Sequence, residues 1–434
     1  MRLVVDSSVF KSRRERVMAQ IGPRAVVLLP GAQLAPRNGD SHYRFRQDSD
    51  FYYLTGFEEP EAFAVLAAGK FTLFVRPRDP EREVWDGRRA GVEGATRDYG
   101  AHEAFPITEL ETRLPAMLAD CDELYYALGR DAARDTRVTA FIERARAMER
   151  RGAHPPRRIV DPRDLLGELR LVKEEAELAV LRRAAEVTAI GHEAAMGLAR
   201  AGVWEYEIEA ALEYAFRRHG ARGPGYTTIV GAGPNACILH YIENTSQLAD
   251  GQLLLVDAGA EYDCYTADVT RTVPVGGKWT PGSRKVYDAV LASQEAALAA
   301  VRPGATLDDI HTRALEVLVA HLHEWKLCEE PKEAIEKGSY RRFYMHRTSH
   351  WLGLDVHDAG SYRQSGEPRR LEPGFVLTVE PGLYFPPDAA DVPEELRGIG
   401  VRIEDDVLVT PTGGDVLTQM IPKRPADLDR VVAR

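Results

Sequence analysis

The sequence predicts a protein of two domains: an α/β domain over residues 1–165, and a second domain over residues 166–434 that combines helices with hairpin strands. A length of 434 residues corresponds to two or three domains of ordinary size. The first part of the chain mixes strand-like runs with a charged helix. A segment rich in proline and charge then separates it from a long helical pattern.

The first domain shows several short strand signals and one hairpin. The runs RAVVLLPGA and ELYYAL are apolar and strand-like, and FAVLAAGKFTLFV predicts a hairpin with its turn at Gly69 and Lys70. The segment DTRVTAFIERARAMERR predicts a charged helix. This mixture is typical of an α/β domain.

The domain boundary is predicted within residues 153–170, where AHPPRRIVDPRDLL is rich in proline and charge. A helix is predicted directly after it, because Leu178, Leu181 and Ala185 recur at helical spacing in KEEAELAVLRRAAEVTAIGHEAAMGLA.

A second helix is predicted at TLDDIHTRALEVLVAHL. Thr306 and Asp309 form the capping-box pattern that marks a helix start. We expect His311, His321 and His323, on or near this helix, to be surface residues.

Five side chains of metal-binding type lie inside or beside apolar, strand-like runs of the second domain. One such carboxylate alone is most often solvated, but a buried carboxylate must be paired or metal-bound because burying it alone costs too much. Carboxylates with one imidazole suit Mn, Co or Zn, and two such ions about 3.5–4 Å apart can share a hydroxide nucleophile. The set therefore predicts a hydrolase with two metal ions. Its members are Asp257, Asp268, His350, Glu380 and Glu404.

Two of the five lie in the segment GQLLLVDAGAEYDCYTADVTRTVPV. Its two β-rich runs flank a polar turn around Glu261 and Tyr262, which predicts a hairpin. Asp257 and Asp268 would lie on opposite faces of one continuous strand, but they can converge across a hairpin.

Glu404 lies in GVRIEDDVLVT, which predicts one strand with Arg402, Glu404 and Asp406 on the same face. Asp405 follows Glu404 directly. Composition does not decide which of the three adjacent acids faces the metals; strand phase and the family resemblance favour Glu404.

Composition narrows the class of protein. A net charge of -11 argues against nucleic-acid binding, which needs clustered Lys and Arg. The four cysteines show no CxxC spacing, which favours reduced thiols in the cytoplasm. The first residues turn charged too soon for a signal peptide, and no run reaches the ~18 apolar residues of a membrane span. We therefore expect a soluble, cytoplasmic protein.

Several motifs together resemble the metallopeptidases of the pita-bread fold, and most closely the aminopeptidase P family. They are SHWLGLDVHD (349–358), VDAG and DVTRT around the two aspartates, TVEPGLYF and GVRIED. In the first domain, RFRQDSDFYYLTGFEEPEA (44–62) and VWDGRR (84–89) resemble the amino-terminal domain of the same enzymes. The resemblance therefore covers nearly the whole chain.

The resemblance implies an α+β pita-bread second domain with a mostly antiparallel curved sheet, and a dimer or tetramer. It implies two divalent ions, with Mn favoured over Co or Zn. Asp257 would bind one ion, Asp268 and Glu404 would bridge both, and His350 and Glu380 would hold the other.

The resemblance also implies roles for residues around the metals. His240, His346 and His357 would bind substrate or stabilise the tetrahedral intermediate. Arg402 would orient a metal-bound carboxylate or assist proton transfer, and Tyr384 would help the same network.

The activity expected from the resemblance is removal of the first residue from peptides with proline at position two. A prolidase, which accepts only dipeptides, is the alternative within the same chemistry. A metal-free peptide-binding protein of the same fold, or a creatinase-type enzyme, is the alternative from another class, and the five intact ligands argue against both. A methionine aminopeptidase is disfavoured because it lacks the large first domain.

One position departs from the family pattern, and one lies in a segment that follows it. Arg347 follows His346 where the family usually has glycine, which bears on side-chain preference. Trp85, in VWDGRR, resembles a segment that reaches toward a partner's active site; otherwise it would be half-buried within its own domain.

Overall fold

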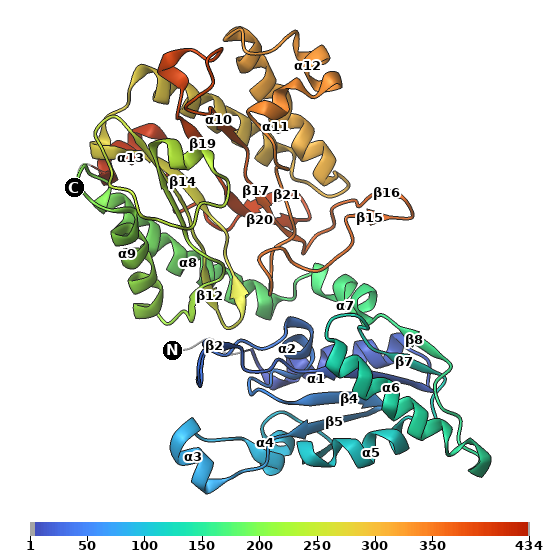
Figure 1. The fold of residues 1–434 in the computed structure, drawn as a ribbon. Coiled ribbons are helices and arrows are strands. Elements are labelled where there is room, and N and C mark those ends of the chain that lie inside the picture. The colour runs from blue at the N-terminus through green and yellow to red at the C-terminus, as the bar shows by residue number, and fades with distance from the viewer. Residues whose placement is uncertain (1–4, 433–434) are drawn as a thin grey trace. The chain divides into compact units, whose positions relative to one another are not determined.

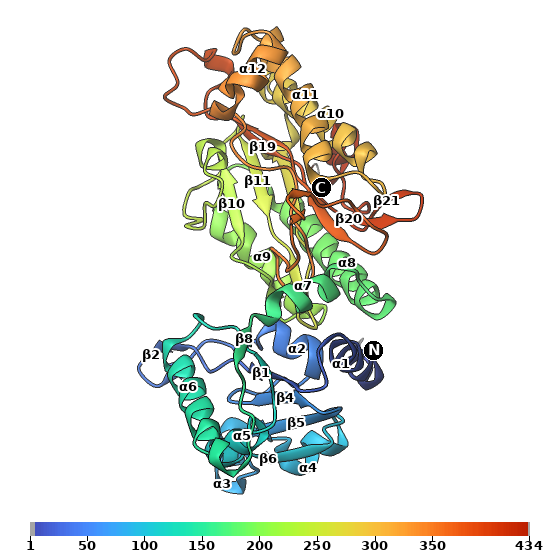
Figure 2. The ribbon, with the colours of Figure 1, turned by 90° about the vertical axis from the view of Figure 1, so that its right-hand side faces the viewer.

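The computed structural model describes residues 5–432 (Figures 1 and 2). The chain forms two compact units that divide between Arg170 and Leu171. The matched motifs of the first domain lie in the first unit, and the five predicted metal ligands all lie in the second.

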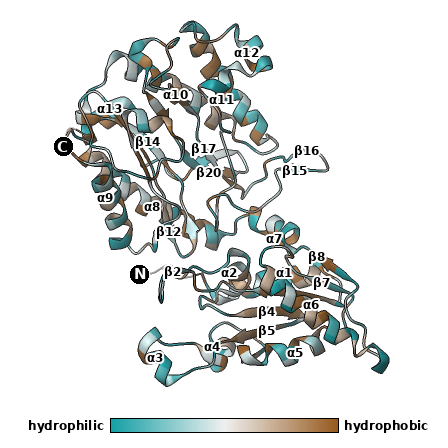
Figure 3. Ribbon diagram, in the orientation of Figure 1, coloured by the Kyte–Doolittle hydropathy of each residue, from teal (hydrophilic) through white to brown (hydrophobic). Residues whose placement is uncertain are grey.

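The first unit is built on a mixed six-stranded sheet. Neighbouring strands β1, β4 and β5 pair antiparallel, and the pairs β1–β7, β5–β6 and β7–β8 are parallel. The strands are mostly apolar, as Figure 3 shows. In sheet order they are β6 (Glu103–Pro106), β5 (Lys70–Val75), β4 (Phe63–Ala67), β1 (Ala25–Pro30), β7 (Glu123–Tyr125) and β8 (Arg158–Val160).

Helices pack on this sheet because its side chains alternate between two apolar faces. Val26 and Leu28 of β1 share a core with residues of α5 and α6. From α1, Arg14 lies with its guanidinium carbon 4.1 Å from the centre of the Phe71 ring. The α/β class is thus confirmed for this unit. Its helices are α1 (Ser7–Gln20), α2 (Ser49–Thr55), α3 (Pro80–Asp86), α4 (Gly91–Arg97), α5 (Leu110–Met117), α6 (Ala132–Arg146) and the start of α7 (Pro162–Leu171).

The hairpin predicted in the first domain is confirmed, with its turn one residue earlier than expected. Ala67 pairs with Lys70, so Ala68 and Gly69 form a two-residue loop. Both have positive φ, 49° and 77°, as the tight turn of a twisted hairpin requires.

The second unit contains several small antiparallel sheets packed with helices. Antiparallel pairing agrees with expectation, but the hydrogen bonds do not join the strands into the single curved sheet that was expected. The larger sheets are β10 (Ile229–Ala232), β11 (Leu253–Asp257) and β14 (Thr270–Pro274); β13 (Tyr265–Thr266), β12 (Ala260–Tyr262) and β9 (Gly223–Pro224); and β17 (Val376–Val379), β20 (Asp405–Thr410) and β21 (Gly413–Val416). The pairs are β18 (Gly382–Tyr384) with β19 (Gly400–Arg402), and β15 (Arg363–Gln364) with β16 (Glu367–Pro368).

The hairpin around the two aspartates is present, but its turn lies two residues later than predicted. Asp263 and Cys264 form the loop with φ of 45° and 68°, between the paired residues Tyr262 and Tyr265. Further from the turn, β11 and β14 pair antiparallel, with Asp257 opposite Thr270. Asp257 therefore ends one strand, and the neighbouring strand begins shortly after Asp268.

The prediction of one continuous strand through GVRIEDDVLVT is wrong. The chain pairs with β18 as far as Arg402, leaves the ladder at Ile403 and Glu404, and then pairs with β17 from Asp405 onward. Changing partner strands interrupts the alternation of faces, and Glu404 lies at this interruption.

Both long helices predicted for the second domain are present, as α8 (Glu175–Leu198) and α11 (Leu307–Glu324), and the Thr306 and Asp309 capping box is formed. α11 lies beside α10 (Pro281–Ala300) in both ribbon views (Figures 1 and 2). The remaining helices are α9 (Glu205–Arg218), α12 (Pro331–Lys337) and α13 (Pro425–Val432).

The surface position predicted for His311 is wrong. Its side chain is buried, and its Nδ1 lies 2.8 Å from Thr348 Oγ1, because the loop before His350 covers this face of α11.

Between residues 5 and 432, every helix is too short or too polar to cross a membrane. The four cysteines, all within this range, form no disulfide.

Candidate metal centre

The five predicted metal ligands line one cavity of about 1000 Å³ in the second unit. Asp257 ends β11, Asp268 precedes β14, Glu380 follows β17, and Glu404 lies between β19 and β20. His350 comes from a loop whose main chain is bonded to β17, where Thr378 N donates to His350 O at 3.0 Å. Strand ends and a braced loop therefore bring these side chains together from well-separated parts of the sequence.

Asp268, His350 and Glu404 form the tightest group, with one ligand atom of each within 4.8 Å of the others. His350 Nε2 lies 3.3 Å from Asp268 Oδ2 and 3.4 Å from Glu380 Oε1. The other ring nitrogen, Nδ1, lies 3.0 Å from Trp351 O. An N–H donated to a main-chain carbonyl leaves Nε2 as the ligand atom, which is the usual arrangement around a metal-binding histidine.

The charge of this group fits divalent cations. Burial raises the pKa of Glu404, and the charges of Asp268 and Glu380 raise it further. Burial likewise raises the pKa of Glu380 to about 7, although His350 opposes the shift. A cation between buried carboxylates favours their charged form and so offsets the rise in their pKa. Oxygen ligands with one imidazole suit Mn, Co or Zn.

The His350 imidazole responds to the same carboxylates. Burial lowers its pKa, but the hydrogen bond to Asp268 and the charge of Glu380 outweigh burial and raise it to about 9. A metal ion at Nε2 would take the place of that proton.

Arg402 ties three groups of the site together. Its Nη2 donates to Asp257 Oδ2 at 2.6 Å, its Nη1 to Tyr384 Oη at 3.0 Å, and its Nε to Thr270 Oγ1 at 3.0 Å. The charge of Arg402 opposes the rise that burial causes in the pKa of Asp257. The guanidinium thus offsets part of the negative charge and orients one carboxylate.

Tyr384 connects Arg402 to His346. Because a guanidinium only donates, Tyr384 Oη accepts from Arg402 and gives its own proton to His346 Nε2, 2.8 Å away. His346 Nδ1 then donates to Arg347 O at 2.8 Å. Burial and the nearby Arg402 charge lower the pKa of His346 to about 3, so this imidazole is neutral.

The other two predicted histidines lie at the open side of the cavity. His240 and His357 are exposed and line it. The His357 ring lies 4.4 Å from that of His350, centre to centre and nearly perpendicular. Burial and the charge of His350 lower the pKa of His357. Both histidines can present a ring nitrogen to a molecule in the cavity.

Three contributors to the site were missed by sequence reasoning. Tyr226 Oη donates to Asp257 Oδ1 at 2.6 Å, and Thr270 Oγ1 donates to Glu404 Oε2 at 2.6 Å. Buried Glu205 accepts hydrogen bonds from residues on both sides of His240, including Ala232 N at 2.8 Å, Tyr241 Oη at 2.9 Å and Ser246 N at 2.7 Å. Only the position of Thr270 inside DVTRT offered a signal, since that motif begins at Asp268.

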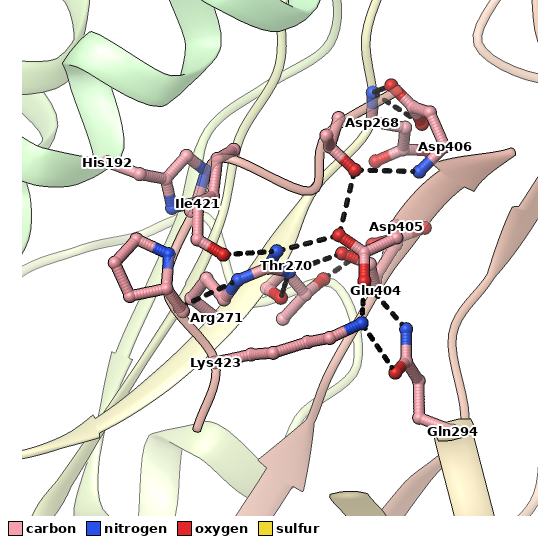
Figure 4. A network of polar contacts seen from close by, with 12 residues as sticks. His192, Asp268, Thr270, Arg271, Gln294, Glu404, Asp405, Asp406, Ile421 and Lys423 are labelled. Atoms are coloured by element: carbon pink, nitrogen blue, oxygen red, sulfur yellow. Dashed lines mark hydrogen bonds and ion pairs between the residues drawn. The ribbon is translucent and has the colours of Figure 1, made fainter. Parts of the chain in front are cut away.

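The three adjacent acids have separate environments, as Figure 4 shows. Asp405 accepts from Arg271 at 2.7 Å and from Lys423 at 2.5 Å, facing away from the cavity. Burial raises the pKa of Asp405, but these two cations outweigh it and hold the pKa low. Asp406 accepts from the main-chain N of Asp268 at 3.2 Å. Of the three, only Glu404 lines the cavity.

Arg347, which departs from the family pattern, also lines the cavity. Its guanidinium pairs with Asp308 near the start of α11, and both side chains are about half exposed. The ion pair at the cavity rim is therefore open to solvent, and water weakens the attraction between its charges.

Comparisons with known proteins agree with the motifs. Residues 179–411 match the model of metallopeptidase family M24, and residues 10–125 match the amino-terminal domain of aminopeptidase P. The chain is 44% identical to the Xaa-Pro aminopeptidase of Escherichia coli K12 over 434 residues, covering 99% of this chain and 98% of that protein. It is 34% identical to human Xaa-Pro aminopeptidase 3, covering 92% of this chain and 78% of that protein.

Solved structures give the same result. Aminopeptidase PepP of Pseudomonas aeruginosa superposes with a TM-score of 0.98 at 46% identity, covering 99% of each chain. Zinc-substituted aminopeptidase P of E. coli in complex with product superposes with a TM-score of 0.96 at 43% identity, also covering 99% of each chain.

Proposed function

Because the chain belongs to the Xaa-Pro aminopeptidases of metallopeptidase family M24, we propose that it uses two divalent metal ions to release the first residue of peptides with proline at position two. It is a metalloaminopeptidase by family. One observation carries the proposal: the four carboxylates and one imidazole of the predicted ligand set line the same cavity.

The ligand roles follow from the family pattern and are supported by the contacts. Asp257 would hold one ion, His350 and Glu380 the other, and Asp268 and Glu404 both. The relatives include a zinc-substituted enzyme. We propose Mn as the native metal, because carboxylate-rich sites favour it.

The fold proposed for residues 166–434 is the pita-bread fold. Its small sheets are linked by further hydrogen bonds, which supports treating them as parts of one curved layer. Glu404 N donates to Thr270 O at 3.1 Å, and Thr272 Oγ1 donates to Arg402 O at 2.9 Å, so β14 lies along the chain that leaves β19.

Ions held here would polarise the scissile carbonyl and lower the pKa of a water molecule. The protein's own residues would do the rest. His240 and His357 face the cavity and would donate to the oxygen that gains charge. Tyr384, whose proton points to His346, would keep that ring oriented toward the site, and Arg402 would hold Asp257 in place.

Proline selection is proposed on chemical grounds. An X-Pro bond is a tertiary amide with a fixed φ, so a shaped site can distinguish it from other peptide bonds. A prolidase remains the alternative, and it differs in accepting only dipeptides.

The test compares hydrolysis of Gly-Pro with that of a longer X-Pro-Y peptide, with metal content measured on the same sample. We expect cleavage of the longer peptide, release of its first residue, two ions per chain, and loss of most activity when alanine replaces the proline. Cleavage of the dipeptide alone would transfer the assignment to prolidase.

A further inference from the structure

We propose that Thr270 is a positioning residue that fixes the Glu404 carboxylate relative to the Arg402 guanidinium. The inference rests on the proposed metal-dependent function. Thr270 is fully buried at the start of β14, and its hydroxyl lies 2.6 Å from Glu404 Oε2 and 3.0 Å from Arg402 Nε.

The direction of these hydrogen bonds is determined by chemistry. Arg402 Nε carries a hydrogen and cannot accept, so Thr270 Oγ1 accepts from it. The single hydroxyl proton is then left for Glu404 Oε2. A carboxylate oxygen has two lone pairs, so accepting this proton leaves a lone pair of Oε2, and all of Oε1, for metal. Thr270 thus orients the Glu404 carboxylate and still leaves lone pairs on its oxygens for a metal ion.

The hydroxyl is needed because Glu404 lies where the chain leaves the ladder between β19 and β20. Arg271 holds the chain there on the side away from the cavity: its Nη1 donates to the main-chain O of Glu404 at 2.5 Å, and its Nη2 donates to the carboxylate of the next residue, Asp405 Oδ1, at 2.7 Å (Figure 4). These contacts hold the Glu404 main chain and the Asp405 side chain but not the Glu404 carboxylate, which carries the proposed ligand oxygens. Thr270 supplies that second constraint.

The same strand offers a matched control. Thr272 is also fully buried, but its hydroxyl donates to the main-chain O of Arg402 at 2.9 Å and accepts from Arg402 N at 3.3 Å, and these bonds involve neither the Glu404 carboxylate nor the Arg402 guanidinium. Replacing either threonine by valine removes one buried hydroxyl at nearly constant volume. Only the change at Thr270 removes a contact with a proposed ligand.

The experiment compares Thr270→Val, Thr270→Ser and Thr272→Val with the unmodified enzyme. Mn affinity is measured by competition with a chelator, ions per chain by mass spectrometry, and kcat and KM with an X-Pro-Y peptide. We expect Thr270→Val to weaken Mn binding by about 10–100-fold, which is the usual effect of losing a contact that orients a metal ligand. The fold-decrease in kcat should be larger than the fold-change in KM. Thr270→Ser should restore Mn affinity, because it keeps the hydroxyl.

Two results would overturn the proposal: Mn affinity of Thr270→Val equal to that of Thr272→Val, or a serine variant as weak as the valine variant. If Thr270→Val does not fold, Thr270→Ala against Thr270→Ser carries the same comparison. An unmodified enzyme that holds fewer than two ions, or does not cleave X-Pro-Y, would remove the proposed function and this inference with it. If the unmodified enzyme passes both tests and the variants do not differ, only the role of Thr270 is lost.

Discussion

Arg402 Nη2 lies 2.6 Å from Asp257 Oδ2, joining residues that are 145 positions apart in the sequence and both nearly buried. Arg402 and a protonated His350 can offset at most two of the charges of the four proposed carboxylate ligands. The remaining negative charge makes the site dependent on cations for stability as well as for catalysis.

Metal removal should therefore destabilise the protein more at high pH than at low pH. The pKa of Glu380 is raised to about 7, above its unfolded value of about 4.3. An acid with a raised folded pKa costs stability as pH rises between these values, because the unfolded chain loses its proton first. Calorimetry with and without a chelator should show a larger fall in Tm at pH 8 than at pH 6. An equal fall at both would contradict this account.

Replacing Glu404 with alanine should abolish activity and release at least one ion, because Glu404 is proposed to contact both ions. Metal analysis and turnover on one preparation provide the measurement. If the variant keeps two ions and near-normal turnover, Glu404 is not a ligand, and Asp406, which lies beside Asp268, becomes the candidate.

The sequence was enough to predict five candidate ligands, and these line one cavity in the structure, but it did not predict the geometry that joins them. A continuous strand would have put Asp406 on the face of Glu404, but the chain changes partner strands at Ile403 and Glu404, and of these two acids only Glu404 lines the cavity. The turn at Asp263 and Cys264 was misplaced because neither residue is a glycine or asparagine, the usual signal for positive φ. The burial of His311 depends on Thr348, 37 positions away, which a helical pattern cannot report.

Trp85 does not pack within its own unit, so the half-buried alternative is wrong. Its side chain is 86% exposed, on a helix with no buried residue. Trp85→Ala should change stability by no more than about 0.5 kcal/mol, as at other exposed sites. If Trp85 contributes to a substrate site, whether of its own chain or of a neighbouring subunit, KM for long peptides should rise in the alanine variant. Tyr214→Ala, which removes another exposed aromatic, is the control. Unchanged kinetics for short and long peptides would eliminate the substrate role.

Arg347 should influence which peptides are preferred. Arg347→Gly removes a positive charge from the cavity rim and leaves Asp308 without this partner. KM for peptides with an acidic side chain should rise by about two- to fivefold relative to neutral peptides, the range for exposed charge pairs, and the effect should shrink at high salt. Arg313→Gly, on the same helix as Asp308 and paired with Glu316, changes the net charge equally outside the cavity. If both variants raise KM for acidic peptides equally, Arg347 has no specific role in peptide preference.

His192 should make the protein sensitive to acid. It is fully buried with Nε2 2.9 Å from Ala258 O, and burial lowers its pKa from 6.5 to about 4. A base with a depressed folded pKa costs stability as pH falls from 6.5 to 4, because the unfolded chain binds the proton first. The full effect is about 3 kcal/mol. Denaturant unfolding should show that the free energy of unfolding of His192→Gln depends less on pH over this interval than that of the unmodified protein. If the two proteins show the same pH dependence, His192 is not the source of the acid sensitivity.

Between β19 and β20 the chain leaves β18 and pairs with β17, and this change has a consequence for how the protein is made. Glu404 reaches its place by a main-chain hydrogen bond to Thr270, 134 residues earlier, while Asp257 and Asp268 leave the ribosome long before it. Contacts of such long sequence separation form late, after most of the chain has been ordered. The five proposed ligands are therefore all present only once translation is nearly finished. Chains that end before residue 404 would lack one of them.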